Sequence, residues 1–224
     1  NYVLLNEAKP PFDNIKARQA LAYALDFEEF NAILGAGILT QATGPFAPGN
    51  IGNLEDSGFP TYDLDEATRL VEEYEAETGE ELSFTYSTTN TQSSIEQGQL
   101  LKEQAEAAGM SVEIITVDQS TLIDGAISGD FEANGWRLHP GGDPDLQYNW
   151  WKSGSPVNFG KFVDPEIDRL LDEGRTTKEG RDQIYEDLNR RFAEQVHNIW
   201  LWYTPWIVAT ATDVHGVPGE GPTS

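Results

Sequence analysis

One short stretch combines indole, guanidinium, imidazole and carboxylate side chains on a backbone rich in glycine and proline. It reads Gly135-Trp136-Arg137-Leu138-His139-Pro140-Gly141-Gly142-Asp143-Pro144-Asp145. We expect a strand to end at Trp136 and to break into a loop, which restarts as an aromatic helix ending in Trp150-Trp151. Aromatic and charged side chains on such a loop are more typical of binding than of core packing. The stretch therefore predicts one wall of a ligand cleft, with Trp136 and Arg137 on it.

The main candidates in this stretch each have a structural interpretation beside the functional one. Trp136 is either a surface on which a ligand stacks or the end of a buried strand. Asp143 either binds a cation or a ligand amine, together with Asp145, or caps the helix that Pro144 opens. His139 is a candidate hydrogen-bond donor to a ligand or a pH-sensitive group.

Outside this stretch, Asn158, Trp202 and Tyr203 complete the candidate ligand-binding set. Asn158 either donates to a ligand or closes a turn. The aromatic run from 199 to 208 is either core or a stacking platform for sugars or aromatic side chains. As a single strand it would place Trp200 and Trp202 on one face and Tyr203 on the other.

Composition limits the class of protein and of partner. The 224 residues carry 38 acids and 14 Lys and Arg, a net charge of −24, so the surface repels nucleic acid and anionic lipid. The chain has no Cys and only three widely spaced His, so neither disulfides nor a metal site is predicted. No cofactor motif is visible and no apolar run is long enough to cross a membrane. Because the chain begins at Asn1, inside an apparent strand, we expect it to be a fragment of a longer protein.

The hydrophobic pattern predicts an α/β fold. Strands are expected around 82–86, 112–117 and 131–138, with helices over 94–108 and 122–127 between them. Such a β-α-β-α-β run requires a largely parallel sheet, and ligands of these sheets lie beyond the carboxyl ends of the strands. Trp136 stands at such an end, so the order of the elements and the predicted cleft agree.

Other helices and loops follow from their end signals. Helices are expected over 14–25 with Asp13 as N-cap, from Asp26 with a capping box to Glu29, around 67–74, and from Asp164 with Pro165 in its first turn. A second capping box, Thr176 to Glu179, predicts the start of the next helix. Residues 38–63 are expected to form a long irregular loop, of a kind that is usually functional or mobile.

Several weak motifs occur together in a fixed order. They are Pro11-Phe12-Asp13, residues 17–26 (ARQALAYALD), Gly44-Pro45, Tyr62-Asp63, Gly129-Asp130-Phe131, Gly135-Trp136, Asp143-Pro144, Asn158-Phe159, residues 164–171 (DPEIDRLL) and Arg181 with Ile184-Tyr185. Over nearly its whole length the chain resembles the family-5 extracellular solute-binding proteins, the receptors of ABC importers for peptides, nickel and some sugars.

The resemblance implies a two-lobed receptor that closes on its ligand. Residues 1–224 would be the second lobe, of the periplasmic-binding-protein type II kind, with a mixed, mostly parallel sheet flanked by helices. Segments near 1–9 and 206–215 would cross to the missing first lobe. The implied partners are a small solute, that first lobe and a membrane permease, and the implied location is extracellular or periplasmic, with a lipid anchor.

The chain departs from the peptide binders of this family at one place. They commonly carry an Asp a few residues after the Gly-Trp pair, where it holds the α-amino group of the ligand. Leu138-His139-Pro140 stands there instead. The departure favours a neutral or sugar-like ligand over an ordinary peptide.

Two further classes of function remain open from the residues. Paired carboxylates with surrounding tryptophans would also suit a glycoside hydrolase, although so many acids make some pairs inevitable. A purely structural or interaction domain is the third class. No nucleophile elbow or catalytic triad is visible, so we expect a binding protein and not an enzyme.

Overall fold

The computed structural model describes residues 1–138 and 141–204. Its main sheet has five strands in the order β4-β3-β5-β1-β6. They are β1 (Tyr2–Leu5), β3 (Ser83–Thr89), β4 (Ser111–Val117), β5 (Ala133–Trp136) and β6 (Asn198–Trp200). β3 pairs in parallel with β4 and β5, whereas β1 is antiparallel to both of its neighbours, β5 and β6. Four strands therefore run in one direction, and the predicted mixed, mostly parallel α/β sheet is confirmed.

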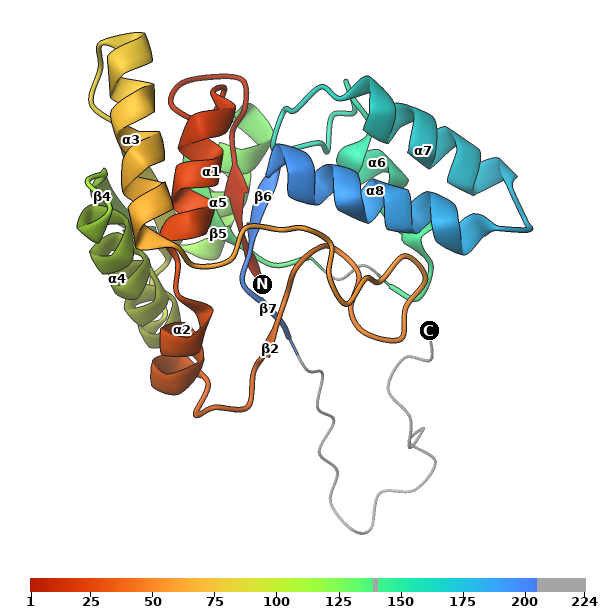
Figure 1. The fold of residues 1–224 in the computed structure, drawn as a ribbon, viewed down its shortest axis with the longest axis horizontal. Coiled ribbons are helices and arrows are strands. Elements are labelled where there is room, and N and C mark those ends of the chain that lie inside the picture. Colours follow the sequence, from red (N-terminus) through yellow and green to blue (C-terminus); the bar gives the residue numbers. More distant parts are fainter. Residues whose placement is uncertain (139–140, 205–224) are drawn as a thin grey trace, which may run out of the picture.

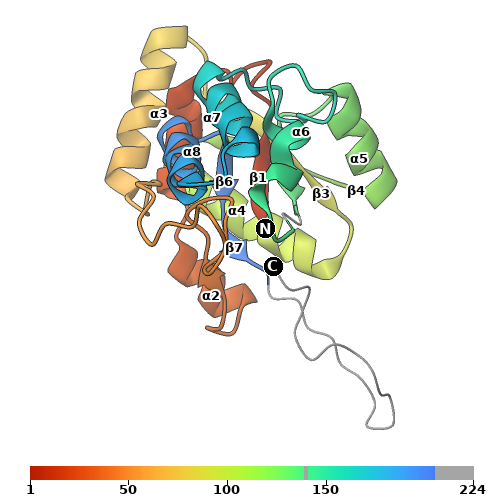
Figure 2. The ribbon, with the colours of Figure 1, turned by 90° about the vertical axis from the view of Figure 1, so that its right-hand side faces the viewer.

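Helices cover both faces of this sheet. They are α1 (Ile15–Ala24), α2 (Phe27–Leu34), α3 (Leu64–Thr78), α4 (Gln92–Ala107), α5 (Gln119–Ser128), α6 (Tyr148–Trp151), α7 (Pro165–Thr176) and α8 (Arg181–Gln195), with the 3-10 turn η1 (Pro144–Gln147) before α6. Figure 1 shows α1, α3 and α4 grouped on one side, the α7–α8 hairpin on the other, and β6 running between them. Figure 2 shows the same layers after a quarter turn.

Side chains on the two faces of the sheet pack against these two helix layers. Phe84 of β3 meets Phe12, which precedes α1, at 5.0 Å between ring centroids. On the other face, Trp200 of β6 lies 6.0 Å from Phe192 of α8 and 5.1 Å from Tyr2 of β1. Both layers bury large aromatic and aliphatic side chains against the sheet, which is the main source of its stability.

Two of the predicted helix starts are wrong. Asn14, and not Asp13, caps α1, because its side chain accepts a hydrogen bond from the Lys16 amide at 2.9 Å. The Thr176–Glu179 capping box does not form, since Thr176 is still helical in α7. Gly180 precedes α8 instead, with φ +74°, a conformation that glycine adopts without strain.

The other capping signals hold. Asp26 caps α2, and Asp164 caps α7 with Pro165 in its first turn. The capping box predicted that the Glu29 side chain would accept a hydrogen bond from the Asp26 backbone amide. Gln104 of α4 lies between the two instead: its side chain accepts from the Asp26 amide at 3.0 Å and donates to the Glu29 carboxylate at 2.6 Å.

The long loop over 38–63 is irregular, as predicted, apart from the short strand β2 (Thr40–Gln41), but it is well packed. Phe46 is buried against Trp151 and Tyr185, and Asn189 of α8 donates to the Gly52 carbonyl at 2.9 Å. The loop thus covers α6 and α8, which argues against the expected mobility.

The aromatic run after α8 is not one strand. It breaks at Leu201 into β6 and β7 (Trp202–Tyr203), and β7 pairs with β2 in a separate two-stranded sheet. The carbonyl of Asn1 accepts from the amides of Leu201 and Trp202, which stabilises this break. Trp200 and Trp202 therefore do not share a face, contrary to the prediction, since Trp202 contacts Phe30 of α2.

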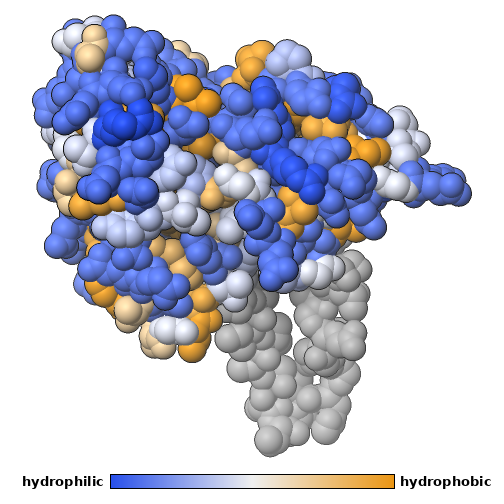
Figure 3. All heavy atoms as spheres, viewed as in Figure 1, coloured by the Kyte–Doolittle hydropathy of each residue, from blue (hydrophilic) through white to orange (hydrophobic). Residues whose placement is uncertain are grey.

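Asn1 and Trp202 lie side by side, because the α-amino group donates to the Trp202 carbonyl at 2.8 Å. The predicted crossover segment near 206–215 lies outside the described residues. None of the helices within the described part has the length and apolar composition needed to cross a bilayer. Figure 3 shows a visible face that is largely hydrophilic, with apolar side chains in scattered patches.

Candidate functional site

The carboxyl edge of the sheet is the place where the predicted binding residues meet. β3, β5 and β6 end there, and β1, which runs the other way, begins there. Tyr2 of β1 is in register with both Trp136 of β5 and Trp200 of β6. This alignment brings Trp136, Arg137, Asn1 and Trp202 to one edge, where open α/β sheets place their ligands.

Trp136 is half-buried at this edge and has partners within the protein. Its ring meets Phe159 edge-on, with centroids 5.8 Å apart, and Phe159 also meets Trp150 at 5.3 Å. Such edge-to-face contacts are favourable because the positive ring edge points at a negative ring face. Trp136 therefore packs against other side chains of the lobe as well as standing at the edge. The chain after α6 folds back across this face, which the sequence did not reveal.

A small cavity lies beneath Trp136. Its free volume is about 20 Å³, and its lining includes Tyr2, Leu138, Trp150 and Asn198. A void of this size holds about one water molecule. This cavity is therefore too small to admit a solute.

Arg137 follows Trp136 and is exposed. It forms no ion pair within the part of the chain that the structure describes. Its charge lies near the α-amino group of Asn1, whose pKa is lowered to about 5, first by burial and then by the Arg137 guanidinium. Arg137 thus adds a positive charge at the edge of a strongly acidic chain.

Neutral polar groups lie beside Arg137. The Asn1 side chain donates to Gln97 Oε1 at 3.3 Å, and Gln97 donates to the Tyr86 hydroxyl, also at 3.3 Å. Gly135 makes this arrangement possible, because a Cβ there would come within 2.5 Å of the Tyr86 hydroxyl. These groups can hydrogen-bond a solute or one another without neutralising the arginine.

The Asp143 carboxylate stabilises the local fold. It accepts from the Asp145 amide at 2.8 Å, which caps η1, and both of its oxygens accept from Arg181 of α8 at 2.6 Å. The hydrogen bond from Arg181 is the main cause of its lowered pKa. Asp145 pairs with Arg175 of α7 at 2.8 Å. The cap interpretation is confirmed, and because both oxygens of Asp143 are paired with Arg181, the structure favours this structural role over ligand binding.

Asn158 is also used in a turn. It is 1 % exposed, and its side-chain amide donates to the Phe162 carbonyl at 3.0 Å. This bond holds the segment that carries Phe159 against Trp136. The structure therefore favours the turn over the ligand for Asn158, and its contribution to the edge is indirect.

The remaining candidates lie at different depths. Trp202 is 9 % exposed, and Tyr203 is half-buried in β7, opposite Thr40. Both come just after β6 ends, so they border the edge without forming an open platform. Trp151 is buried and Trp150 half-buried, as expected for neighbours on a helix. His139 lies outside the described residues.

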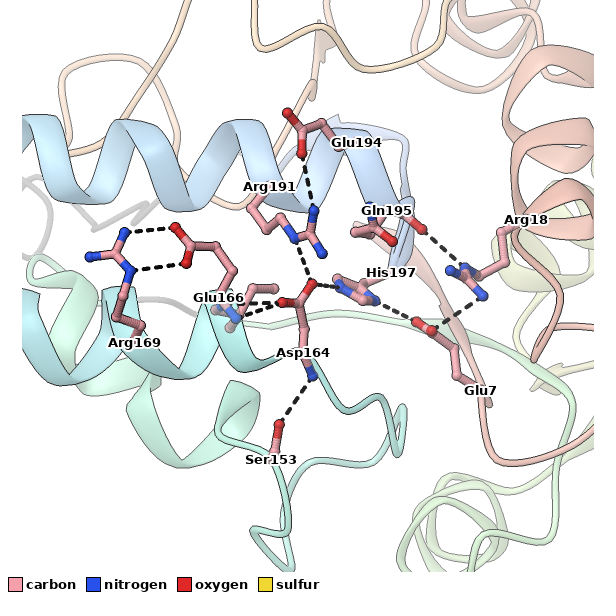
Figure 4. A network of polar contacts seen from close by, with 11 residues as sticks. Glu7, Arg18, Ser153, Asp164, Glu166, Arg169, Arg191, Glu194, Gln195 and His197 are labelled. Atoms are coloured by element: carbon pink, nitrogen blue, oxygen red, sulfur yellow. Dashed lines mark hydrogen bonds and ion pairs between the residues drawn. The ribbon is translucent and has the colours of Figure 1, made fainter.

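A buried polar network, which the sequence did not predict, lies away from this edge (Figure 4). His197 is 3 % exposed and stacks on Phe162 at 4.2 Å. Its Nδ1 lies 2.7 Å from Glu7 Oε1, and its Nε2 lies 3.3 Å from Asp164 Oδ2. Because both ring nitrogens face carboxylates, the doubly protonated imidazolium fits best.

Two arginines complete the network. Arg18 of α1 lies 3.2 Å from Glu7, and Arg191 of α8 lies 2.7 Å from Asp164. Burial would lower the pKa of His197, but its bonds to Asp164 and Glu7 outweigh burial and raise it. Burial would likewise raise the pKa of Asp164, yet bonds from His197 and Arg191 hold it below its usual range. The network joins α1 to the α7–α8 hairpin and is structural, since every carboxylate in it is paired.

Among the described residues, no cluster of His, Asp or Glu has the arrangement of a metal site. The groups that the described residues bring to the carboxyl edge are an aromatic ring, a guanidinium and neutral hydrogen-bonding groups. These are the components of a binding surface.

Comparison with known proteins gives a consistent result. Residues 1–159 match the family described as bacterial extracellular solute-binding proteins, family 5 Middle. The chain is 27% identical to the "Probable di/tripeptide-binding protein 5" of Pseudomonas aeruginosa, an alignment covering 89% of this chain and 39% of the relative. It is 30% identical to "Heme-binding protein A" of Haemophilus influenzae, in an alignment that covers 92% of this chain and 38% of that relative. The oligopeptide-binding protein AppA of Bacillus subtilis, solved with a nonapeptide, superposes with a TM-score of 0.78 at 24% identity, covering 90% of this chain and 44% of that one.

Proposed function

Because the chain belongs to the family 5 bacterial extracellular solute-binding proteins, we propose that it is one lobe of a receptor that captures a peptide-like solute for an ABC permease. The observation that carries the proposal is the position of Trp136 and Arg137 at the carboxyl edge of a mostly parallel sheet. Aromatic and charged groups at this edge are placed to bind a solute.

The proposal includes a second lobe. The chain spans about two fifths of the length of the curated relatives it matches. The cavity beneath Trp136 is too small to enclose a solute. A ligand is usually enclosed over most of its surface, which a second lobe closing over the edge would provide.

A peptide-like solute is better supported than a sugar. The named ligands of two of the similar proteins are di- and tripeptides and a nonapeptide. The sugar-like ligand expected from the sequence required an open indole face at Trp136, but Phe159 already lies against this ring. Among the described residues at the edge, no pair of carboxylates supports the glycoside hydrolase alternative.

The proposed place of action follows from the family. Its members are extracellular solute-binding proteins, and a receptor of this kind passes its solute to a permease in the membrane. We include in the proposal a lipid anchor in the complete protein, which would hold the receptor near that permease.

The test is Trp136→Ala in the complete two-lobed receptor, with di- and tripeptides as probes. We expect peptide affinity to fall at least about tenfold, because an aromatic side chain is lost from the interface. The cost in unfolding free energy should be about 2 kcal/mol, below that of a fully buried Trp, because the ring is half-buried. Trp150→Ala is the matched control, since Trp150 meets the same Phe159 from α6 and should affect stability more than affinity.

Calorimetry would give the affinities and urea unfolding the stabilities. A stability loss in Trp136→Ala with unchanged peptide affinity would make Trp136 a core residue and would contradict the proposed site.

A further inference from the structure

Arg137 differs from most cations of this chain. With 38 acids and only 14 Lys and Arg, most cationic side chains find a carboxylate partner. Arg169, Arg175 and Arg181, for example, each lie in an ion pair. Within the described residues, the cations without such a pair are Lys9, Arg137, Lys161 and Lys178. Arg137 is the member of this group that stands at the carboxyl edge, next to Trp136.

The surroundings of Arg137 explain why it stays unpaired. The residues placed beside it, Asn1 and Gln97, are neutral, and they bond to each other. The first turn of α4, which starts at the same edge, carries no acidic side chain. Within the described residues, no carboxylate lies in an ion pair with the Arg137 guanidinium. In a chain of net charge −24, a locally positive edge is the place where an anionic solute can approach.

We propose that the captured solute carries a carboxylate and that Arg137 binds it. A guanidinium offers paired N–H donors that match the two oxygens of a carboxylate, and the bond strengthens where a closing lobe excludes water. The position where peptide binders carry an amine-holding Asp is occupied here by Leu138-His139-Pro140. This inference rests on the proposed function.

The carboxylate can be the C-terminus of a peptide or an acidic side chain, and matched probes separate the two. The first pair is trialanine and trialanine amide. The second pair consists of tripeptide amides with a central Glu or a central Gln. Affinities for all four probes would be measured by calorimetry with the complete receptor, with Arg137→Gln and with Arg137→Lys. Lys178→Gln is the matched control, because it removes an exposed, unpaired charge between α7 and α8.

We expect the wild-type receptor to bind the anionic member of at least one pair about tenfold more tightly. Arg137→Gln should abolish this preference without weakening the neutral probes, Arg137→Lys should retain part of it, and Lys178→Gln should leave it unchanged. Equal binding of anionic and neutral probes by the wild type, or a preference that survives Arg137→Gln, would overturn the inference and leave the proposed function standing. Failure of the wild-type receptor to bind any of the four would overturn both.

Discussion

His197 is held between two carboxylates, one at each ring nitrogen. Its raised pKa means that the folded state binds the proton more tightly than the unfolded chain. The resulting stability is fully present below the pKa of the unfolded chain, about 6.5, and is lost as pH rises through the higher pKa of the folded state. We therefore expect the free energy of unfolding to decrease as pH rises above about 6.5.

The measurement is urea unfolding across this pH range, together with an NMR titration of the His197 ring. Glu7→Gln should move the alkaline decrease to lower pH, because one of the charges that raises the pKa has gone. A pH dependence identical in wild type and His197→Gln would show that another group causes it.

At the residue scale, the sequence predicted the position of side chains at the edge better than it predicted the role of each side chain. Trp136 and Arg137 could be placed from the end of a predicted strand. The sequence also left open whether Asp143 caps a helix, and the structure confirms the cap. The partners of Asp143 and His197 are Arg181, Glu7 and Asp164, which lie 33 or more residues away from them, and no local pattern indicates contacts of that range.

At the scale of elements, the Tyr86 side chain of β3 can lie against β5 because Gly135 has no side chain. A Cβ at this position would lie 2.5 Å from the Tyr86 hydroxyl and 3.0 Å from Thr88 Oγ1. We expect Gly135→Ala to cost about 1–3 kcal/mol of unfolding free energy, since it overpacks a buried contact.

Urea unfolding of a double-mutant cycle tests this explanation. Tyr86→Phe removes the closest atom, so Gly135→Ala should cost less in the Tyr86→Phe background than in the wild type. Equal costs in the two backgrounds would rule out the hydroxyl as the obstacle.

The elements that sequence reasoning predicted correctly are those with strong local signals. Alternating or β-branched residues predicted β3 and β4, and Asp118 and Asp164 indicated the starts of α5 and α7. The break at Leu201 depends on hydrogen bonds to Asn1, at the other end of the chain. The close packing of the 38–63 loop likewise depends on residues of α6 and α8. Neither could be deduced from the local pattern.

At the scale of the whole molecule, the net charge of −24 opposes compactness. Ions screen repulsion between exposed charges beyond about 3 Å at 1 M salt, compared with about 10 Å at 0.1 M. We expect the free energy of unfolding to rise between 0.1 M and 2 M KCl. Sucrose at equal osmolality is the control, because it favours burial without screening charge. A gain as large in sucrose as in KCl would contradict a screening effect.

The central claim is that the carboxyl edge of the sheet receives the solute. Hydrogen–deuterium exchange of the complete receptor, with and without a mixture of di- and tripeptides, tests it most directly. The backbone amides at the ends of β3 and β5, residues 88–91 and 135–138, should become protected when the peptides bind. The α7–α8 hairpin should keep its exchange rates. Protection confined to that hairpin, or to the opposite ends of the strands around residues 83 and 111, would place the solute elsewhere and contradict the account.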